Sequence, residues 1–151
     1  MRATPSRLVT SNLSPFRHYR QRCRPQAGEV AFQVVVEQTD LWITARQDYA
    51  DAAHAVVRGL RGGLKAYIVL RPEYQASLVP LAVEPGAPGI VRDMARAGAL
   101  CGVGPMAAVA GAMAEAVARR FVDQSPDFLV ENGGDTFLCS TRERVVGLLP
   151  D

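Results

Sequence analysis

The chain has 151 residues, enough for one domain with a sizeable core. Hydrophobic residues make up 48% and charged residues 21%, as in ordinary globular proteins, and no apolar run approaches the ~20 residues that a membrane-spanning helix needs. Three widely spaced cysteines (Cys23, Cys101 and Cys139) argue against a disulfide framework or a zinc site and favour a reducing compartment. We therefore expect a cytoplasmic protein that does not enter a membrane.

Positive charge is concentrated near the N-terminus. Six of the 17 basic residues lie in residues 1–28, which contain no acid, so 11 basic residues accompany all 15 acidic ones in residues 29–151. An arm that binds nucleic acid is one interpretation of such a segment. We favour a basic leader in front of a single folded unit, with Phe16 and Tyr19 docked on that unit, because no RNA-stacking module accompanies the arginines. Nucleic acid is not an expected partner.

The folded unit opens with two predicted strands. Val30, Phe32, Val34 and Val36 alternate with other residues over 29–37, and Leu41, Ile43 and Ala45 continue the alternation over 41–46. A period of two with β-branched residues indicates strands with one buried face. Since only a couple of polar residues separate the runs, we expect an antiparallel hairpin.

A change of period predicts a long helix next. Apolar residues from Tyr49 to Ile68 recur at helical spacing, and Asp48 is a suitable N-cap. The opposite stripe is polar and comprises Asp51, His54, Arg58, Arg61 and Lys65. We interpret it as a solvated face and expect no catalytic role for His54. With His18 the only other histidine, a histidine-based triad or multi-histidine metal centre is not expected.

The remaining elements complete an α+β pattern. We expect a short helix at 72–78, a Pro- and Gly-rich surface connection at 81–89, a helix at 90–97 capped by Gly98, and a long helix from Pro105 to about Val122. Strands are predicted at 128–130, 136–139 and 144–149. Strand pairs on either side of a helical block favour an antiparallel sheet with helices on one face.

Two glycine-rich turns are the candidate binding elements. The first, Gly102-Val103-Gly104-Pro105, precedes a helix, whose N-terminal N–H groups and dipole form a generic cradle for phosphate or carboxylate. We favour an ordinary tight turn as its explanation, since neither a Walker loop nor a dinucleotide fingerprint is present. The second, Asn132-Gly133-Gly134-Asp135, is either a hairpin turn or a place where bare backbone meets a ligand, with Glu131 and Asp135 adding polar contacts.

Three motifs together carry a resemblance to a known family. VRDM at 91–94, GVGPMAAVAGAMAE at 102–115 and VENGGD at 130–135 resemble the uncharacterised prokaryotic branch of the ApbE-like superfamily. Its better-known members are FAD-dependent flavin transferases, and the resemblance covers residues 16–149. It implies a T-fold unit of two strands, two helices and two strands. The family duplicates this unit, so a homo-oligomer or another partner would complete the site.

The resemblance also implies a ligand and a function. In the transferases a glycine-led helix entry and an N-x-GGD-like turn border the flavin, which implies binding of FAD or a related nucleotide at Gly102, Gly104, Pro105, Glu131, Asn132, Gly133, Gly134 and Asp135. The family's Lys-Gly and Asp have no counterpart where Pro105 and Met106 stand, so no catalytic residue is assigned. Mg²⁺ is implied without identifiable ligands. The alternative function is a non-catalytic accessory protein in sulfide and homocysteine metabolism.

Overall fold

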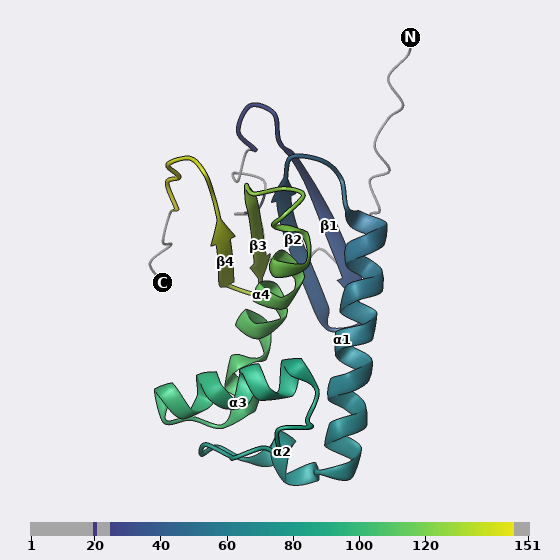
Figure 1. Ribbon diagram of the computed structural model, residues 1–151, viewed down its shortest axis with the longest axis vertical. Helices are drawn as coiled ribbons and strands as arrows, with labels where there is room; N and C mark the ends of the chain where they lie inside the picture. Colours follow the sequence, from purple (N-terminus) through teal and green to yellow (C-terminus); the bar gives the residue numbers. More distant parts are fainter. Residues whose placement is uncertain (1–19, 21–24, 147–151) are drawn as a thin grey trace.

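The computed structural model describes Arg20 and residues 25–146, which form a four-stranded antiparallel sheet with helices packed on one face (Figure 1). The strands pair in the order β1-β2-β3-β4. This confirms the expected α+β class. The elements in chain order are β1 (Val30–Val36), β2 (Thr39–Ala45), α1 (Ala50–Leu70), α2 (Pro72–Ala76), α3 (Gly89–Cys101), the 3-10 turn η2 (Pro105–Ala108), α4 (Val109–Phe121), β3 (Phe128–Asn132) and β4 (Asp135–Cys139).

One core lies between the sheet and the helices α1 and α4. The register pairs Phe32 with Ile43 and Ile43 with Val130, so alternate residues of the three strands face the same side. The ring centroid of Tyr49, the N-cap of α1, lies 5.0 Å from that of Phe121 at the end of α4, with the rings tilted by 35°. The period-two and helical patterns read from the sequence therefore meet in one layer of apolar side chains.

A second core lies beyond the sheet, where α1 extends past it and carries α2 and α3 (Figure 1). Tyr74 of α2 is its largest fully buried side chain. The Tyr74 hydroxyl donates a hydrogen bond of 2.8 Å to the carbonyl of Val91, and burial raises the pKa of Tyr74 to about 12. Among the described residues, no single helix has both the length and the hydropathy to cross a bilayer; α3 and the η2–α4 segment meet those criteria only together, as a pair bent by 106°.

Several helix ends differ from those expected. Asp48 is not the N-cap: α1 begins one residue later than that would require, with Tyr49 as N-cap, while the Asp48 carboxylate accepts from the Ala50 N–H. Gly98 lies inside α3, which Gly102 ends in the left-handed conformation at φ 70°. Pro105 opens a 3-10 turn, and α4 begins at Val109. These ends are set by tertiary contacts, which local patterns do not reveal.

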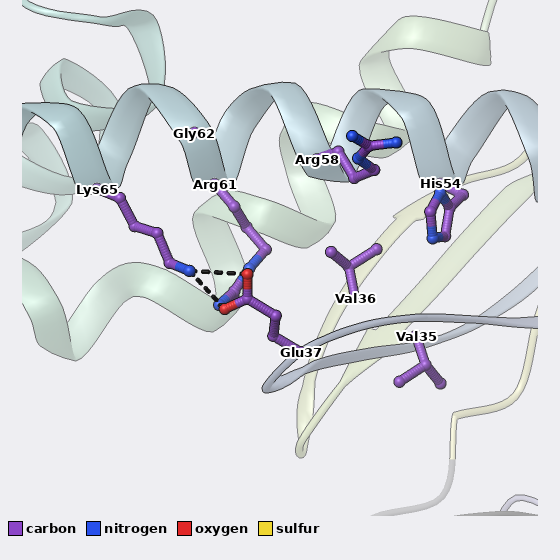
Figure 2. Close-up of a pocket in the computed structure, with 8 residues that line it drawn as sticks. All are labelled: Val35, Val36, Glu37, His54, Arg58, Arg61, Gly62 and Lys65. Carbon is purple, nitrogen blue, oxygen red and sulfur yellow. Dashed lines mark hydrogen bonds and ion pairs between the residues drawn. The ribbon is translucent and has the colours of Figure 1, made fainter.

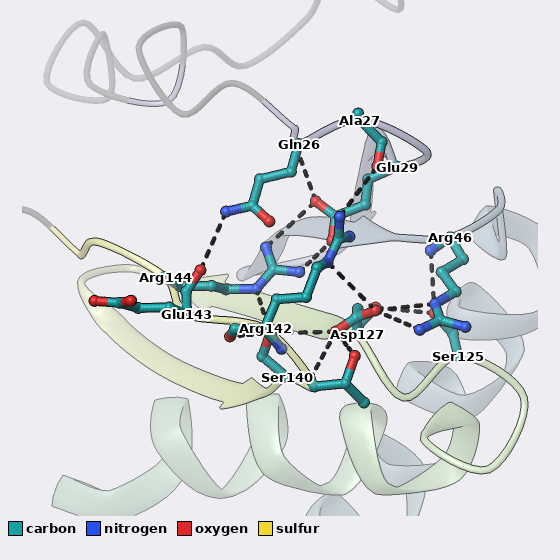
Figure 3. Close-up of polar contacts among 11 residues, drawn as sticks. Gln26, Ala27, Glu29, Arg46, Ser125, Asp127, Ser140, Arg142, Glu143 and Arg144 are labelled. Carbon is teal, nitrogen blue, oxygen red and sulfur yellow. Dashed lines mark hydrogen bonds and ion pairs between the residues drawn. The ribbon is translucent and has the colours of Figure 1, made fainter.

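The segment after β4 is held by buried carboxylates instead of forming the strand expected at 144–149. Residues 144–146 belong to no strand, and residues 147–151 lie outside the described part. Arg142 and Arg144 both donate to the fully buried carboxylate of Glu29, and Ser140 and Arg142 are drawn beside Asp127 (Figure 3). Side-chain ion pairs thus replace the ladder hydrogen bonds of a fifth strand. The expected docking of Phe16 and Tyr19 also falls outside the described residues.

Candidate functional site

The first glycine turn is packed against protein backbone. The Gly104 N–H donates a hydrogen bond of 3.0 Å to the carbonyl of Leu78. A Cβ atom added at Gly104 would lie 1.8 Å from the Ser77 carbonyl oxygen, so that side of the turn is filled by the chain itself. Pro105 is fully buried, and Gly102 ends α3. The structure therefore gives these residues a packing role, and their role as a ligand cradle stays a prediction.

The second glycine turn closes the β3–β4 hairpin. Asn132 pairs with Asp135 in the ladder, and Gly133 and Gly134 take the positive φ angles of 63° and 106° that a tight hairpin turn requires. The Asn132 side chain donates to the Ala110 carbonyl of α4 at 3.0 Å. Glu131 accepts from the Gly134 N–H at 2.9 Å. These two hydrogen bonds support the turn.

The exposed part of this hairpin turn faces the small-residue helix. Gly133, Gly134 and Asp135 are exposed, and an Asp135 carboxylate oxygen lies 3.5 Å from where a Cβ of Gly111 would stand. The small residues of α4 thus let β4 lie close to the helix, which is the packing explanation for the alanine- and glycine-rich sequence. Ligand contact at the exposed glycines stays a prediction.

A different feature is an open hollow in the described structure, and we call it the basic cleft. It has a volume of about 410 Å³ and lies between α1 and the β1–β2 turn (Figure 2). Its volume falls within the range typical of small-molecule sites. The basic cleft is lined by Val35, Val36, Glu37, His54, Arg58, Arg61, Gly62 and Lys65.

One end of the basic cleft is a network around Glu37. The Glu37 carboxylate accepts from Lys65 Nζ at 2.7 Å and from Arg61 at 2.7 Å. Arg61 also donates to Thr39 Oγ1 at 2.8 Å, and its side chain is only 14% exposed. Its Nε is buried and has no hydrogen-bond partner among the described residues. Hydrogen bonds from Lys65 and then Arg61 lower the pKa of the Glu37 carboxyl.

The other end of the basic cleft presents charge that is not neutralised within the described part of the chain. Arg58 and His54 lie farther along α1 from Lys65 and Arg61, are exposed, and make no hydrogen bond or ion pair with the residues that the structure describes (Figure 2). Because Glu37 is the only acid that lines the cleft, the three permanent cations outnumber it. An anion would therefore be attracted to this end.

The sequence placed these cations on one stripe of α1 but did not reveal the cleft. Residues at i, i+4, i+7 and i+11 share a helix face, and we had interpreted this face as simply solvated. Thr39 and Glu37 belong to the β1–β2 hairpin, and the sequence does not show that this hairpin lies against the stripe. The sequence offered two signals of the cleft: an acid, Glu37, at the predicted hairpin turn, and a stripe of cations along the helix that follows the hairpin.

Other candidate sites are weaker among the described residues. A second cavity of about 100 Å³ lies beside Tyr67, whose hydroxyl already donates to Glu84 at 3.0 Å. No group of three or more His, Cys, Asp or Glu side chains in the described ranges is arranged to hold a metal ion. Cys101 and Cys139 are free thiols.

Comparison with known proteins supplies the family. A family model described as AbpE bacteria matches residues 20–151, most of the chain. The chain belongs to this family. A UPF0280 protein of Methanopyrus kandleri is 41% identical over 120 residues, covering 78% of this chain and 48% of the relative. A UPF0280 protein of Methanocaldococcus jannaschii is 34% identical over 117 residues, covering 77% of this chain and 47% of the relative. The chain thus spans about half the length of these relatives.

These findings correct the family expected from the motifs. The matched family and its relatives point to the UPF0280 family, so the resemblance to the ApbE-like superfamily of flavin transferases is wrong. The structure supplies the physical reason that the motifs misled. Gly104 is small because Ser77 packs on it, and Gly133-Gly134 closes a hairpin, so neither glycine pattern requires a flavin. Binding of FAD or Mg²⁺ and a role in sulfur metabolism stay untested.

Proposed function

We propose that the protein binds a small phosphate-bearing molecule, such as a nucleotide, in the basic cleft. One observation carries the proposal: four side chains able to carry positive charge line one hollow, and two of them, Arg58 and His54, make no polar contact with the described residues. Charge-assisted hydrogen bonds to phosphate are among the stronger polar contacts. A guanidinium can also bind phosphate oxygens in bidentate fashion.

The cleft also offers contacts to the rest of such a ligand. Val36 lines its strand side and points toward α1, whereas the side chain of Val35, 39% exposed, points away from the helix (Figure 2). Apolar side chains beside a few fixed charges are the usual composition of a small-molecule site. The phosphate would lie among the cations of α1, from Arg58 to Lys65, and the organic part would cover Val36. The free thiols of Cys101 and Cys139 are consistent with the cytoplasm as the compartment.

Calorimetric titration tests this proposal. Adenosine monophosphate, flavin mononucleotide and inorganic phosphate are titrated into the protein in low-salt buffer, with adenosine as the phosphate-free comparison. Because Arg58 is the guanidinium of the basic cleft that is exposed and has no partner in the described residues, Arg58→Ala should raise the Kd of a bound phosphate compound about tenfold. Arg96→Ala removes an equally charged, exposed side chain of α3 and should leave the Kd unchanged.

Other results would contradict the proposal. If none of the three phosphate compounds binds at millimolar concentration, the proposal is wrong. If Gly133→Asn weakens binding while Arg58→Ala does not, the ligand site lies at the β3–β4 turn instead; Asn tolerates the left-handed backbone there. Tighter binding of a single-stranded oligonucleotide than of the mononucleotide would indicate a nucleic-acid surface.

A further inference from the structure

Glu37 stands where a ligand's anionic group would be expected to lie. Its carboxylate takes up both cations at its end of the basic cleft, with Lys65 and Arg61 each at 2.7 Å. Figure 2 shows both side chains reaching from α1 to this carboxylate. A phosphate that binds at this end and the Glu37 carboxylate would therefore compete for the same donors, Lys65 and Arg61.

The backbone at Glu37 is held in an unusual conformation for this residue type. Its φ of 54° makes it the one non-glycine residue with positive φ in the described part of the chain. Gly, Asn and Asp are the residues that two-residue hairpin turns favour at such positions. A glutamate here is not explained by the turn, but it is explained by its reach to Arg61 and Lys65.

The two cations differ in how firmly they are held. Arg61 is largely buried and also donates to Thr39 and to Gln38, so it is fixed whether or not Glu37 contacts it. Lys65 is 57% exposed, and the partner carboxylate is 49% exposed. Exposed ion pairs of this kind contribute little net free energy. Lys65 can therefore exchange Glu37 for another anion at small cost.

From this arrangement, and resting on the proposed function, we propose that Glu37 is a built-in competitor for the ligand's phosphate. In the free protein its carboxylate holds Lys65, and when a phosphate binds, Lys65 moves from Glu37 to the phosphate. Glu37 thus lowers the affinity of the basic cleft for anions and keeps it open to exchange. No covalent change is involved.

Removing this carboxylate should tighten binding. Glu37→Gln keeps the length of the side chain and loses the charge, and we expect its Kd for adenosine monophosphate to fall about two- to fivefold below that of the unsubstituted protein. Glu115→Gln is the matched control, since Glu115 pairs with Arg119 on the exposed side of α4. Its Kd should not change. Glu37→Asn, which suits the left-handed backbone, should reproduce the effect if Glu37→Gln disturbs the turn.

Lys65 offers an independent measurement, because it is the only lysine in the sequence. After reductive ¹³C-methylation, which keeps its charge, its methyl NMR signal can be followed alone beside that of the N-terminus. Glu37→Gln should shift this signal, and adenosine monophosphate should shift it in the unsubstituted protein. No binding in either protein would contradict the proposed function. Binding that depends on Arg58, with Kd equal in Glu37→Gln and Glu115→Gln, would overturn only the competitor role.

Discussion

At the residue scale, Asp127 shows how a charge can be kept inside this fold. One carboxylate oxygen accepts from the Thr141 N–H at 2.8 Å and from the Thr141 hydroxyl at 2.9 Å. The other accepts from Arg46 at 2.6 Å (Figure 3). These contacts, the Thr141 N–H foremost and Arg46 next, hold the pKa of Asp127 far below its ordinary value of 3.8. The buried carboxylate is therefore ionised and links β3 to the segment after β4.

This contact set predicts a pH-dependent contribution to stability. Because the native pKa of Asp127 lies below the unfolded one, the contribution is fully present above about pH 4 and is lost as the pH falls further. Asp127→Asn should lower the Tm at pH 7, since an amide N–H₂ group would face the Arg46 donors, and the difference should narrow below about pH 4. Asp123→Asn, at an exposed acid, is the control. Equal Tm values at pH 7, or a difference independent of pH, would contradict this account.

At the element scale, two helical glycines should respond oppositely to alanine. A Cβ at exposed Gly59 of α1 would meet nothing within 4 Å, so Gly59→Ala should raise the free energy of unfolding by about 0.5–1 kcal/mol. A Cβ at Gly98 of α3 would lie 2.8 Å from the Val103 carbonyl oxygen. Gly98→Ala should therefore cost about 1–3 kcal/mol, more than the helix propensity gained. Urea denaturation measures the free energy of unfolding of both variants. If Gly98→Ala stabilises the protein as much as Gly59→Ala does, the backbone at Val103 moves to accept the added methyl group, and this account is wrong.

The difference between a glycine on an open helix face and one packed against a distant segment also explains how far the sequence could predict the elements. The alternation at Val30–Val36 and the period of apolar residues along α1 predicted those elements because each pattern records burial within one element. The roles of Gly98 and Gly104 could not be read in this way. They depend on Val103 and Ser77, which approach only in the folded chain. The basic cleft could not be predicted either, because it forms only where α1 and the β1–β2 turn lie side by side in the folded chain.

At the scale of the whole molecule, Arg20 joins the basic leader to the sheet. It bridges two strands: its Nε donates to Glu131 of β3 at 2.6 Å, and its NH1 donates to Asp40 of β2 at 2.8 Å. Only 4% of its side chain is exposed. Arg20 lies within the leader predicted for residues 1–28, and the family match begins at this residue. The folded unit therefore includes at least this residue of the leader.

Replacing Arg20 should consequently destabilise the whole unit. Breaking a buried ion pair by removing one partner costs about 3–5 kcal/mol in other proteins, because the remaining charge is shielded from water. For Arg20→Ala we expect a loss of about 2–4 kcal/mol in the free energy of unfolding, measured by urea denaturation of the full chain. Arg119→Ala breaks an exposed pair with Glu115 and should cost no more than about 1 kcal/mol. If Arg20→Ala costs no more than Arg119→Ala, the leader does not stabilise the sheet, and the bridge between β2 and β3 is carried by their ladder alone.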